Sequence, residues 1–459
     1  MELKNLILNT DSYKTSHFVQ YPPGTEYVSS YIESRGGDYD ESCFFGLQMF
    51  LKDYLTTPIS QEDIDEAENI ILAHGLPFNR AGWEHILNEH GGYLPLEISA
   101  VPEGSVVPNH NVLAQVVNTD PKVPWLTSYA ETMLLRGVWY PTTVATISRH
   151  VKKVIKRYLD ETADSSEGLP FKLHDFGARG VSSNESAAIG GLAHLVNFQG
   201  TDTVVSLVAA RRYYGESMAG FSIPAAEHAT MTAWGRTHEG DAYANMLEHY
   251  GGEGKMLAVV SDSYDIWNAI DNIWGKDLKE KVTNSGGTLV VRPDSGDPAT
   301  VVCTAINKLM DAFGYSVNSK GYRILPDYVR IIQGDGVSPG SIEKILEIMK
   351  HQRLSADNVA FGMGSALLQR LNRDTLKFAM KASAARVNGE WRDVYKDPVT
   401  DPGKESKKGR LALVKKGSSF ETIKADNLSG RENLLVPVFK DGELIVDQTL
   451  EEVRAKAAL

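Results

Sequence analysis

Short runs of apolar and β-branched residues recur through the middle of the chain, and each run ends in polar, charged or glycine residues. The runs start about 20–40 residues apart, and helix-like stretches such as SIEKILEIMKHQ (341–352) lie between them. This spacing suits a repeated unit of one strand, one loop and one returning helix. In chain order the runs are FKLHDFGARG (171–180), HLVNFQGTDT (194–203), FSIPAAEH (221–228), MLAVVSDSYD (256–265), TLVVRPDSGD (288–297), YVRIIQGDGV (328–337) and NVAFGMGSAL (358–367).

The repeated unit predicts an α/β fold with an irregular, TIM-like (β/α) barrel over residues 166–384. In such a barrel the loops at the carboxyl ends of the strands gather at one face. Each polar cluster alone could simply cap a helix, since Asp and Ser do so routinely. Seven clusters in series, rich in Asp, Arg, His and Gly, favour a shared site instead. Its candidate residues are His174, Asp202, His228, Asp262, Arg292, Asp294 and Asp335.

The flanking segments follow a different pattern. Residues 1–165 mix strand-like pieces such as TEYVSSYIES (25–34) with helical ones such as QEDIDEAENIILAHG (61–75). Residues 385–459 alternate short strand-like stretches with turns, and KDG (440–442) is typical of a β-hairpin. We expect the N-terminal segment and the C-terminal, β-rich segment to fold together as a mixed α+β domain.

Composition narrows the class of protein. The 459 residues are enough for two domains with a large core, and 42% hydrophobic and 23% charged residues are ordinary for a globular enzyme. The 47 Lys and Arg against 59 Asp and Glu give a net charge of −12. General nucleic-acid binding needs a basic field, so we expect no nucleic-acid partner. A local basic pocket for one polyanion remains compatible with this charge.

Cysteine usage and hydropathy indicate a cytoplasmic protein. Cys43 and Cys303 are too far apart in sequence to make a disulfide framework, which favours a reducing compartment. The N-terminal stretch MELKNLILNTDSYK lacks the apolar run of a signal peptide. No stretch approaches the roughly 18 apolar residues of a membrane span, so we expect no membrane association.

The chemistry-bearing motifs favour phosphate and Mg²⁺. A Walker loop, a zinc-protease motif and a Gly-x-Ser-x-Gly elbow are missing, and GMGSAL (362–367) lacks the third glycine of a dinucleotide fingerprint. What remains are Asp-, Gly- and Arg-bearing loops such as RPDSGDP (292–298) and IQGDGV (332–337). Glycine-loop N–H groups hold anions, and carboxylates with substrate phosphates hold Mg²⁺. Each loop alone is also compatible with an ordinary turn.

The basic stretch near the C-terminus and the Glu227–His228 pair each allow more than one interpretation. The stretch SKKGR (406–410), with Lys396 and Lys404, is either a solvated loop or a phosphate clamp. In PAAEHATMTAWG (224–235), Glu227 suits the first turn of a helix, where the dipole stabilises a carboxylate. His228 beside it is, from the residues alone, more simply explained as a packed histidine that orients the backbone.

Several long motifs resemble the nicotinamide phosphoribosyltransferases, a group of the type II phosphoribosyltransferases, and the resemblance runs nearly end to end. It implies the barrel fold of that family and a homodimer with a composite active site. The matching motifs are NTDSYKTSHFVQYPPGT (9–25), KLHDFGARGVSS (172–183), NFQGTDTV (197–204), IPAAEHATMTAWG (223–235), VVSDSYDIWNA (259–269), VRPDSGDP (291–298), IQGDGV (332–337) and KDPVTDPGKESKKGRL (396–411).

The resemblance implies a reaction in NAD salvage. Nicotinamide and phosphoribosyl pyrophosphate would give nicotinamide mononucleotide and pyrophosphate, with Mg²⁺, and ATP would be hydrolysed through a phosphohistidine. The ring nitrogen attacks the anomeric carbon through an oxocarbenium-like state. A neutral nucleophile needs little general-base help, so the protein must mainly position two substrates and neutralise the leaving pyrophosphate.

The resemblance also implies the nicotinamide pocket. Phe176 would stack on one face of the ring, and Tyr13, supplied by the partner subunit, on the other. Asp202 would accept a hydrogen bond from the carboxamide and repel the carboxylate of nicotinic acid. Arg179 and Arg292 match residues near the amide and the sugar phosphate, where the Arg fork can bind two oxygens.

The remaining roles concern phosphates and the histidine. Gly364 and Ser365 occupy phosphate-loop positions, and Asp294 and Asp335 match ribose-hydroxyl and catalytic-site carboxylates. By the same resemblance, His228 is the residue that ATP phosphorylates. Asp262 would support it. The pyrophosphate and ATP side would come from Arg35, Arg373, Lys381, Lys396 and Lys404, some of them contributed by the second subunit across an isologous interface.

The chain departs from better-known members of the family at three positions. Ala178 replaces a Tyr, Ala258 a Ser, and Ser365 a Gly, and these changes fall in the expected nicotinamide tunnel and phosphate loop. Two other functions stay open at this point. One is a nicotinate phosphoribosyltransferase with a similar barrel, against which Asp202 argues. The other is a non-catalytic binding protein, against which the intact motifs argue.

Overall fold

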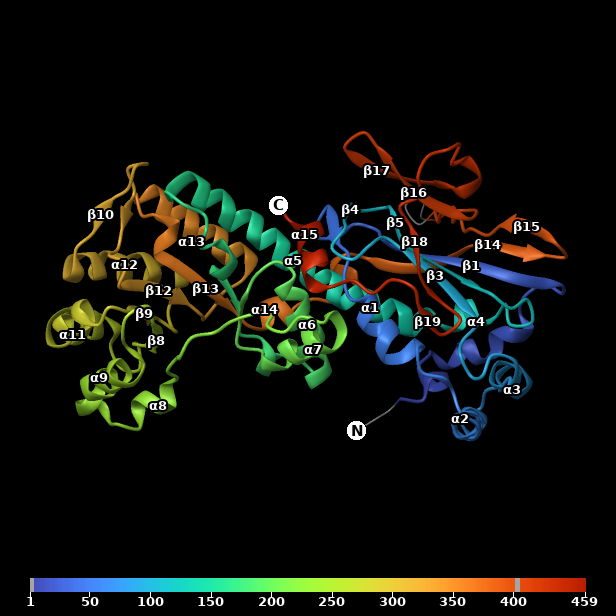
Figure 1. The fold of residues 1–459 in the computed structure, drawn as a ribbon, viewed down its shortest axis with the longest axis horizontal. Helices are drawn as coiled ribbons and strands as arrows, with labels where there is room; N and C mark the ends of the chain where they lie inside the picture. Colours follow the sequence, from blue (N-terminus) through green and yellow to red (C-terminus); the bar gives the residue numbers. More distant parts are fainter. Residues whose placement is uncertain (1–3, 401–404) are drawn as a thin grey trace. The chain divides into compact units, whose positions relative to one another are not determined.

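The computed structural model describes residues 4–400 and 405–459. The chain divides into two compact units (Figure 1). The terminal unit takes in the chain up to residue 146, residues 212–216 and residues 372–458. The central unit takes in residues 147–211, residues 217–371 and Leu459.

The central unit is built on a parallel sheet of six strands in the order β7-β6-β13-β12-β9-β8. Every adjacent pair of these strands is parallel. The predicted α/β class with a parallel, barrel-like sheet is therefore confirmed. The strands are β6 (Leu173–Asp175), β7 (Gly200–Thr201), β8 (Met256–Val260), β9 (Thr288–Arg292), β12 (Val329–Gln333) and β13 (Val359–Met363).

The run FSIPAAEH (221–228), expected to be a strand, instead links the two edges of this sheet. Phe221 makes a single parallel bridge to Gly200 of β7, and Ala225 makes one to Ala258 of β8. Pro224 has no N–H to donate, which prevents a continuous ladder, although its carbonyl accepts from the Ala258 N–H at 2.9 Å. The barrel is therefore irregular because its closing segment is not a full strand.

Helices return the chain between the strands, and their starts follow capping chemistry. The side chains of Ser183, Asp297 and Ser338 each accept a backbone N–H three residues on, and Pro298 and Pro339 occupy the first helical turn. The expected helix near 341–352 is confirmed as α13, and α12 packs against both α13 and β12. The return helices are α6 (Asn184–Leu195), α7 (Val204–Tyr214), α9 (Glu239–Tyr250), α12 (Pro298–Phe313) and α13 (Pro339–His351).

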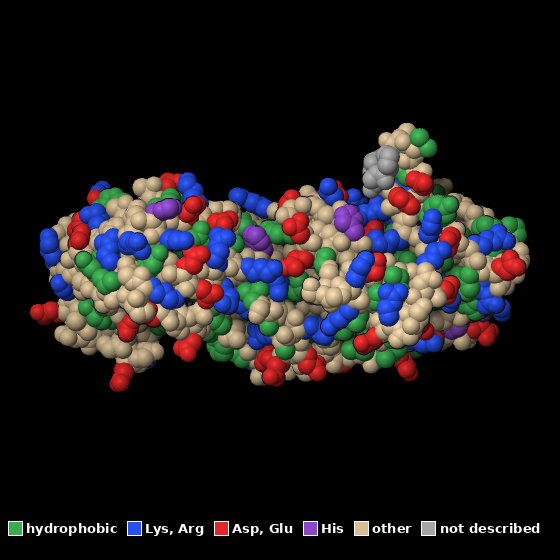
Figure 2. Space-filling view, turned by 90° about the horizontal axis from the view of Figure 1, so that it is seen from above, with side chains coloured by type: hydrophobic (Ala, Val, Ile, Leu, Met, Phe, Trp, Pro, Cys, Tyr) green, Lys and Arg blue, Asp and Glu red, His purple; other side chains and the backbone are tan. Residues whose placement is uncertain are grey.

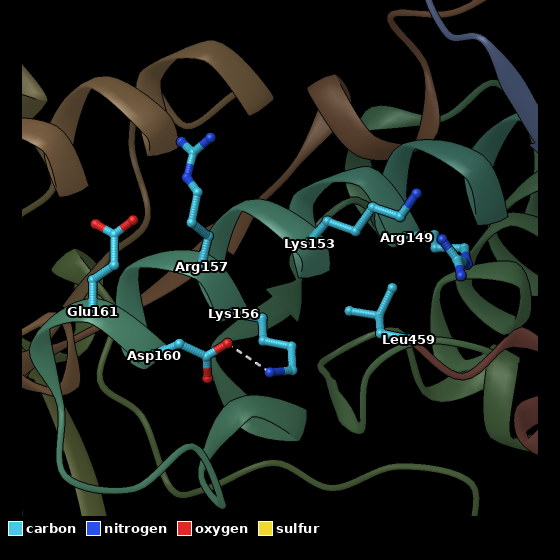
Figure 3. Close-up of a pocket in the computed structure, with 7 residues that line it drawn as sticks. All are labelled: Arg149, Lys153, Lys156, Arg157, Asp160, Glu161 and Leu459. Atoms are coloured by element: carbon cyan, nitrogen blue, oxygen red, sulfur yellow. Dashed lines mark hydrogen bonds and ion pairs between the residues drawn. The ribbon is translucent and has the colours of Figure 1, made fainter.

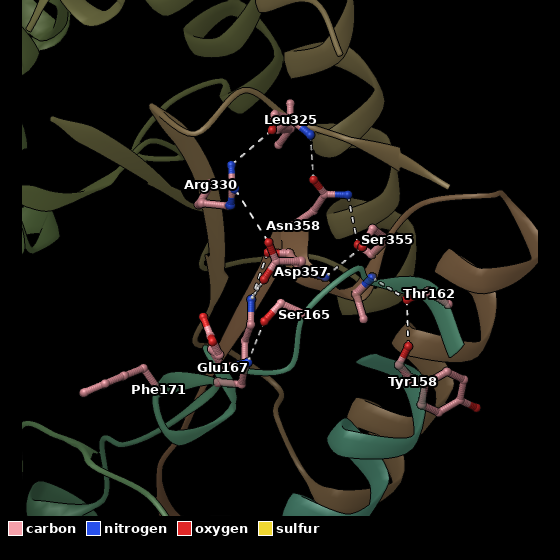
Figure 4. A network of polar contacts seen from close by, with 12 residues as sticks. Tyr158, Thr162, Ser165, Glu167, Phe171, Leu325, Arg330, Ser355, Asp357 and Asn358 are labelled. Carbon is pink, nitrogen blue, oxygen red and sulfur yellow. Dashed lines mark hydrogen bonds and ion pairs between the residues drawn. The ribbon is translucent and has the colours of Figure 1, made fainter. Parts of the chain in front are cut away.

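A polar network lies at the amino ends of the strands (Figure 4). Lys172, just before β6, pairs with Asp357 at 2.9 Å, and Arg330 of β12 lies 3.7 Å from the other Asp357 oxygen. Thr162, at the end of α5 (Glu131–Thr162), accepts the Ala356 N–H at 2.9 Å. Burial lowers the pKa of Lys172, against the charge of Asp357. Since this edge lies opposite the loops that carry the motifs, the network serves stability.

The terminal unit is built on an antiparallel sheet in the order β15-β14-β1-β5-β3-β18-β19, which joins N-terminal and C-terminal segments. The stretch TEYVSSYIES forms β1, as expected, and pairs with both β5 and β14. The strands are β1 (Thr25–Ser34), β3 (Leu96–Ala100), β5 (Val112–Asn118), β14 (Phe378–Val387), β15 (Glu390–Asp393), β18 (Val436–Lys440) and β19 (Glu443–Leu444).

Two local predictions in this unit are confirmed. Asp441 and Gly442 both have positive φ, 49° and 91°, and form the two-residue turn of the β18–β19 hairpin. The expected helix near 61–75 is α2 (Gln61–Ala73), and Ser60 and Asp63 close a capping box at its start. Another hairpin is β16 (Leu411–Lys416) with β17 (Ser419–Lys424), and α15 (Leu450–Ala457) follows near the C-terminus.

Cys43 and Cys303 are both buried, and no disulfide joins them. Burial raises the pKa of the Cys303 thiol to about 11, which keeps it protonated and unreactive at neutral pH. Within the described ranges, none of the helices combines the length and the apolar character that a bilayer crossing requires.

Candidate active site

The candidate residues of the central unit follow the carboxyl ends of the parallel strands. Asp202 comes directly after β7, Asp262 two residues after β8, Asp294 two residues after β9 and Asp335 two residues after β12. Arg292 is the last residue of β9. Parallel strands end at the same edge of a sheet, so the predicted convergence of these loops is a property of the fold.

His228, Asp262 and Asp294 are in direct contact. His228 Nε2 lies 3.0 Å from Asp262 Oδ1, and His228 Nδ1 lies 3.8 Å from Asp294 Oδ2. The second Asp262 oxygen accepts the Asp294 N–H at 2.9 Å and the Ser295 hydroxyl at 2.5 Å. The Asp262 side chain is 4% exposed, whereas that of His228 is 46% exposed. Asp262 is thus buried, and both of its oxygens accept hydrogen bonds. The imidazole of His228 is partly exposed to solvent.

The segment that closes the barrel also positions His228. Pro224, Ala225 and Ala226 are tied to Ala258 of β8 by backbone hydrogen bonds and a bridge. The chain then enters α8 (His228–Thr232), with Glu227 as its N-cap residue. The Glu227 N–H donates to the Thr230 hydroxyl at 3.2 Å. Glu227 thus stands at the N-cap, directly before the first turn in which it was expected.

Side chains of both charge signs lie close to Asp294. Arg292 Nη2 lies 3.7 Å from Asp294 Oδ2, and the Arg292 Nε is buried without a hydrogen-bond partner among the described residues. Burial raises the pKa of Asp294, and the charges of Asp262 and Asp335 raise it further, against those of Arg292 and His228. Asp335 therefore belongs to the same electrostatic group. Arg292 keeps unused donor capacity for an anion.

The Phe176 ring packs against glycine and apolar residues. A β-carbon at Gly362 would lie 1.9 Å from Phe176 Cε2, and one at Gly334 would lie 3.4 Å from both Phe176 Cε2 and Asp294 Oδ1. Phe176 also packs against the cluster of Ala258, Val290 and Ile332 on β8, β9 and β12. The departure at Ala258 thus belongs to the apolar cluster against which the aromatic ring packs.

Asp202 lies on the neighbouring strand end, in a polar group of its own. Its N–H donates to the Asp175 carbonyl at 3.0 Å, and its side chain accepts the Ser222 hydroxyl at 2.5 Å. The Asp175 carboxyl beside it is buried, and burial raises its pKa to about 6. Burial lowers the pKa of His174, against the charge of Asp202. Asp202 is therefore the exposed member of this group, beside the buried Asp175 carboxyl.

Two loops meet at the expected phosphate positions. A β-carbon at Gly180 would lie 2.3 Å from the Ser365 hydroxyl, so Arg179, exposed in the preceding turn, borders the loop that carries Ser365. A β-carbon at Gly364 would lie 3.6 Å from the Phe176 carbonyl. The structure therefore brings the Arg179, Phe176 and Gly364–Ser365 segments side by side.

The terminal unit contains a separate basic cluster around the end of β1. The Tyr31 backbone pairs across the sheet with Lys381, and Arg35 follows the strand. Burial lowers the pKa of Lys381, and the nearby cations Arg35, Lys396 and Lys14 act in the same direction, against Glu131. Arg35 Nη2 is buried without a hydrogen-bond partner among the described residues.

Two carboxylates lie within this basic cluster. Arg35 Nε lies 3.0 Å from Glu33 Oε1, Lys407 pairs with the other Glu33 oxygen, and Lys14 pairs with Glu131 at 2.8 Å. The cations Arg35, Lys14, Lys381, Lys396 and Lys407 therefore outnumber the carboxylates Glu33 and Glu131. The stretch SKKGR contributes Lys407 to a built basic site, which favours the clamp interpretation over a solvated loop.

The other predicted residues are placed as follows. Tyr13, in the 3₁₀ helix Ser12–Val19, is 56% exposed, with Lys14 Nζ 5.2 Å from its ring centroid. Arg373 pairs with its neighbour Asp374 at 2.9 Å, and among the described residues no hydrogen bond or ion pair joins its side chain to the basic cluster. Lys404 lies outside the described residues.

Sequence reasoning missed several partners of these residues. Ser295 and Ser222 stand within quoted motifs, but hydroxyl groups carry no distinctive pattern. Glu33 and Lys407 are 374 residues apart, and only the sheet brings them together. Arg35 stands two residues after Glu33, directly after β1, and this spacing is the one local signal of the Glu33–Arg35 ion pair.

A hollow on the central unit shares no residue with this site. It has a volume of about 510 Å³ and lies over residues 149–161 of α5 and Leu459 (Figure 3). Lys156 there pairs with Asp160 at 2.6 Å, and Arg157 pairs with Glu343 at 2.7 Å. Figure 2 likewise shows Lys and Arg side chains mixed with Asp and Glu over the visible face.

Comparisons with known proteins give matches over nearly the whole chain. The nicotinate phosphoribosyltransferase (NAPRTase) family model matches residues 171–443, and a model of the nicotinamide phosphoribosyltransferase N-terminal domain matches residues 5–98. A nicotinamide phosphoribosyltransferase from Xanthomonas campestris pv. campestris is 54% identical over 462 residues, which cover 99% of this chain and 98% of that protein.

Solved structures show the same fold at low identity. A nicotinate-nucleotide pyrophosphorylase from Pyrococcus furiosus has a TM-score of 0.64 at 16% identity, covering 100% of this chain and 96% of that one. The human nicotinic acid phosphoribosyltransferase has a TM-score of 0.53 at 17% identity, covering 98% and 92%. The predicted type II phosphoribosyltransferase fold, a barrel with a separate mixed domain, is confirmed.

Proposed function

Because the chain belongs to the nicotinamide phosphoribosyltransferases, within the nicotinate phosphoribosyltransferase family, we propose that it joins nicotinamide to phosphoribosyl pyrophosphate in NAD salvage. The products are nicotinamide mononucleotide and pyrophosphate. One observation carries the proposal most directly. An aromatic ring, Phe176, and an exposed carboxylate, Asp202, follow the adjacent strands β6 and β7.

This pair suits a flat aromatic amide. Stacking on Phe176 contributes roughly 0.5–1.5 kcal/mol beyond the area it buries. Asp202 accepts a hydrogen bond from the carboxamide NH₂, while the carboxylate of nicotinate would meet a like charge there. Gly362 and Gly334 leave the space in which the Phe176 ring lies, since any side chain there would displace it.

The other residues at the strand ends bind the sugar and its phosphate. Arg292 offers a buried, unpartnered Nε, and the Gly364–Ser365 loop offers backbone N–H groups for the 5′-phosphate. Asp294 and Asp335 face the ribose hydroxyls. The pyridine nitrogen forms a bond to the anomeric carbon as the C–O bond to pyrophosphate breaks, and the bonding pair leaves with pyrophosphate. This nitrogen carries no proton, so the step needs no general base.

ATP hydrolysis is coupled to synthesis through His228. Asp262 accepts the Nε2–H of His228 and so leaves the Nδ1 lone pair available. Nδ1 attacks the γ-phosphorus of ATP and ADP departs, and water later cleaves the N–P bond to release phosphate. The partial exposure of His228 allows the nucleotide to approach, and the buried Asp262 stabilises the ring as it gains charge.

The donor chemistry at this edge fits Mg²⁺. Burial and the neighbouring carboxylates raise the pKa of Asp294, and a cation would relieve that repulsion. Asp294 and Asp335 would hold the ion together with substrate phosphates, whereas both Asp262 oxygens already accept hydrogen bonds. When bound, Mg²⁺ would neutralise charge on the leaving pyrophosphate.

The basic cluster of the terminal unit binds the pyrophosphate and the ATP phosphates. Its buried and unpartnered Arg35 nitrogen, and its excess of cations, suit a highly charged anion. We assign Tyr13 to the nicotinamide site of a second subunit, where its exposed ring would cover the face opposite Phe176. The active unit is then a homodimer with two composite sites.

A product assay tests this function. Purified protein is mixed with nicotinamide, phosphoribosyl pyrophosphate and Mg²⁺, with and without ATP. We expect mononucleotide and pyrophosphate in equal amounts, and a higher yield with ATP. No mononucleotide at any ATP concentration would contradict the proposal and favour a binding protein on the same fold.

A further inference from the structure

A cluster of two histidines and an aspartate lies in the terminal unit, and none of its residues belongs to the candidate active site. His85 Nε2 lies 2.7 Å and His90 Nε2 2.8 Å from the same oxygen of Asp120, Oδ2. The three atoms lie within 4.8 Å of one another. We propose that this cluster binds a divalent first-row transition metal ion of the zinc type.

The end of α3 (Arg80–Glu89) brings the two rings together. Residues five apart on a continuous helix point about 140° away from each other. Here the helix stops, with His90 as its C-cap, and Gly91 and Gly92 follow with φ of 59° and 84°. The His90 and Gly92 N–H groups both donate to the Ile86 carbonyl at 3.1 Å, which tightens this turn. The ring centroids consequently lie only 5.8 Å apart.

Asp120 is oriented toward the rings by its own loop. Its Oδ1 accepts the Lys122 N–H at 2.8 Å, and its carbonyl accepts from the Asn118 side chain at 2.8 Å. The Oδ2 is therefore held toward the histidines.

Two imidazoles and one carboxylate are the donor set of a zinc-type ion with an open position for water. Mg²⁺ and Ca²⁺ prefer oxygen ligands alone. Metal–ligand bonds of about 2.0–2.1 Å in a tetrahedron place the ligand atoms about 3.3 Å apart. The two N···O separations of 2.7 and 2.8 Å need to open by only about half an ångström. The side chains are 14–25% exposed, so small rotations suffice. The metal replaces the two Nε2 protons, which pass to Nδ1 or to solvent.

The experiment measures Zn²⁺ and Co²⁺ binding to the full-length, chelator-treated protein. The test variant is His85→Gln with His90→Gln, and the matched control is His238→Gln, which removes an exposed histidine paired with Asp241 in the other unit. Calorimetry with Zn²⁺ should give one site per chain in the wild type and the control. The double variant should bind at that site at least tenfold more weakly, and Co²⁺ should lose its visible absorption band.

Folding of the double variant is checked by thermal unfolding without metal. Zn²⁺ should raise the melting temperature of the wild type and the control, but not that of the double variant. Equal Zn²⁺ affinity in the double variant and the wild type would overturn the proposal. So would wild-type protein that binds neither ion at one equivalent, because the cluster would then be only a hydrogen-bonded clasp between α3 and the loop after β5.

Discussion

Asp262 determines which nitrogen of His228 is available for chemistry. It is almost fully buried and uses both oxygens, one for His228 Nε2 and one for the Asp294 N–H and the Ser295 hydroxyl. A carboxylate held this way cannot rotate without breaking three hydrogen bonds. The orientation of the imidazole is therefore fixed before any ligand binds, which is the geometry that a nucleophilic histidine needs.

Replacing His228 by Ala should remove ATP coupling while leaving part of the ATP-independent synthesis. The phosphate acceptor is lost, but Phe176, Asp202 and Arg292 remain. The measurement is acid-labile ³²P on the protein after incubation with γ-labelled ATP, together with mononucleotide yield. The His238→Ala variant, changed at an exposed histidine, should behave as wild type. Retained acid-labile phosphate on His228→Ala would show that another residue is the acceptor.

The buried carboxyl of Glu103 makes stability depend on pH. Burial raises its pKa from 4.5 to about 7, although the N–H groups of Gln48 and Gly46 and the Tyr214 hydroxyl donate to it. The folded state therefore favours the protonated form. The contribution of protonated Glu103 to the free energy of unfolding is complete below pH 4.5. It is lost as the pH rises through 7, by up to about 3 kcal/mol.

Glu103→Gln should flatten this dependence, because an amide does not ionise and can still accept the two backbone N–H groups. Urea unfolding at pH 5 and pH 8 measures the free energy of unfolding at both ends of the range. The wild type and the exposed-site control Glu443→Gln should lose stability between these values, and Glu103→Gln should lose much less. An equal loss in all three proteins would refute the assignment to Glu103.

At the scale of elements, six parallel strands and their loops carry the site, and their polar clusters could be predicted from sequence. The run FSIPAAEH (221–228) could not be recognised as irregular, because its apolar residues match a strand while Pro224 interrupts the ladder. Hairpin and capping chemistry at Asp441–Gly442 and Ser60–Asp63 is local and was predictable. The Glu33–Lys407 pair and the His85–His90–Asp120 cluster depend on long-range packing and were not.

Gly362 on β13 should tolerate no side chain, because a β-carbon would lie 1.9 Å from Phe176 Cε2. Overpacking of this kind typically costs about 1–3 kcal/mol. Here it would displace the Phe176 ring from its position against nicotinamide. Gly362→Ala should therefore raise the KM for nicotinamide roughly tenfold. Steady-state kinetics measure this. The control Gly340→Ala, with open space around the new methyl, should leave the KM unchanged.

At the scale of the whole molecule, the terminal unit joins both ends of the chain in one sheet, and the central unit carries the parallel strands. The candidate residues divide in the same way. The base, sugar and histidine positions belong to the central unit, and Tyr13 with the basic cluster belongs to the terminal unit. A dimer would let each catalytic centre combine residues from two chains.

Mixing two inactive variants tests this composite site. Tyr13→Ala and Phe176→Ala should each be nearly inactive alone, because each removes one side of the aromatic sandwich. Unfolded and refolded together, random pairing should restore about a quarter of wild-type activity, since half of the dimers carry one intact site. Phe176→Ala mixed with Arg292→Ala should restore none. Failure of the first mixture to recover activity would contradict the shared site.

The preference between the two pyridine bases tests the central claim most directly. The ratio of kcat/KM for nicotinamide to that for nicotinate is measured at pH 7 for the wild type and for Asp202→Ser. The wild type should prefer nicotinamide, and the variant should reduce the ratio roughly 10–100-fold, the effect of about 1.5–3 kcal/mol for a hydrogen bond to a charged group. A wild type that turns over nicotinate with the higher kcat/KM, or an unchanged ratio in the variant, would contradict the account.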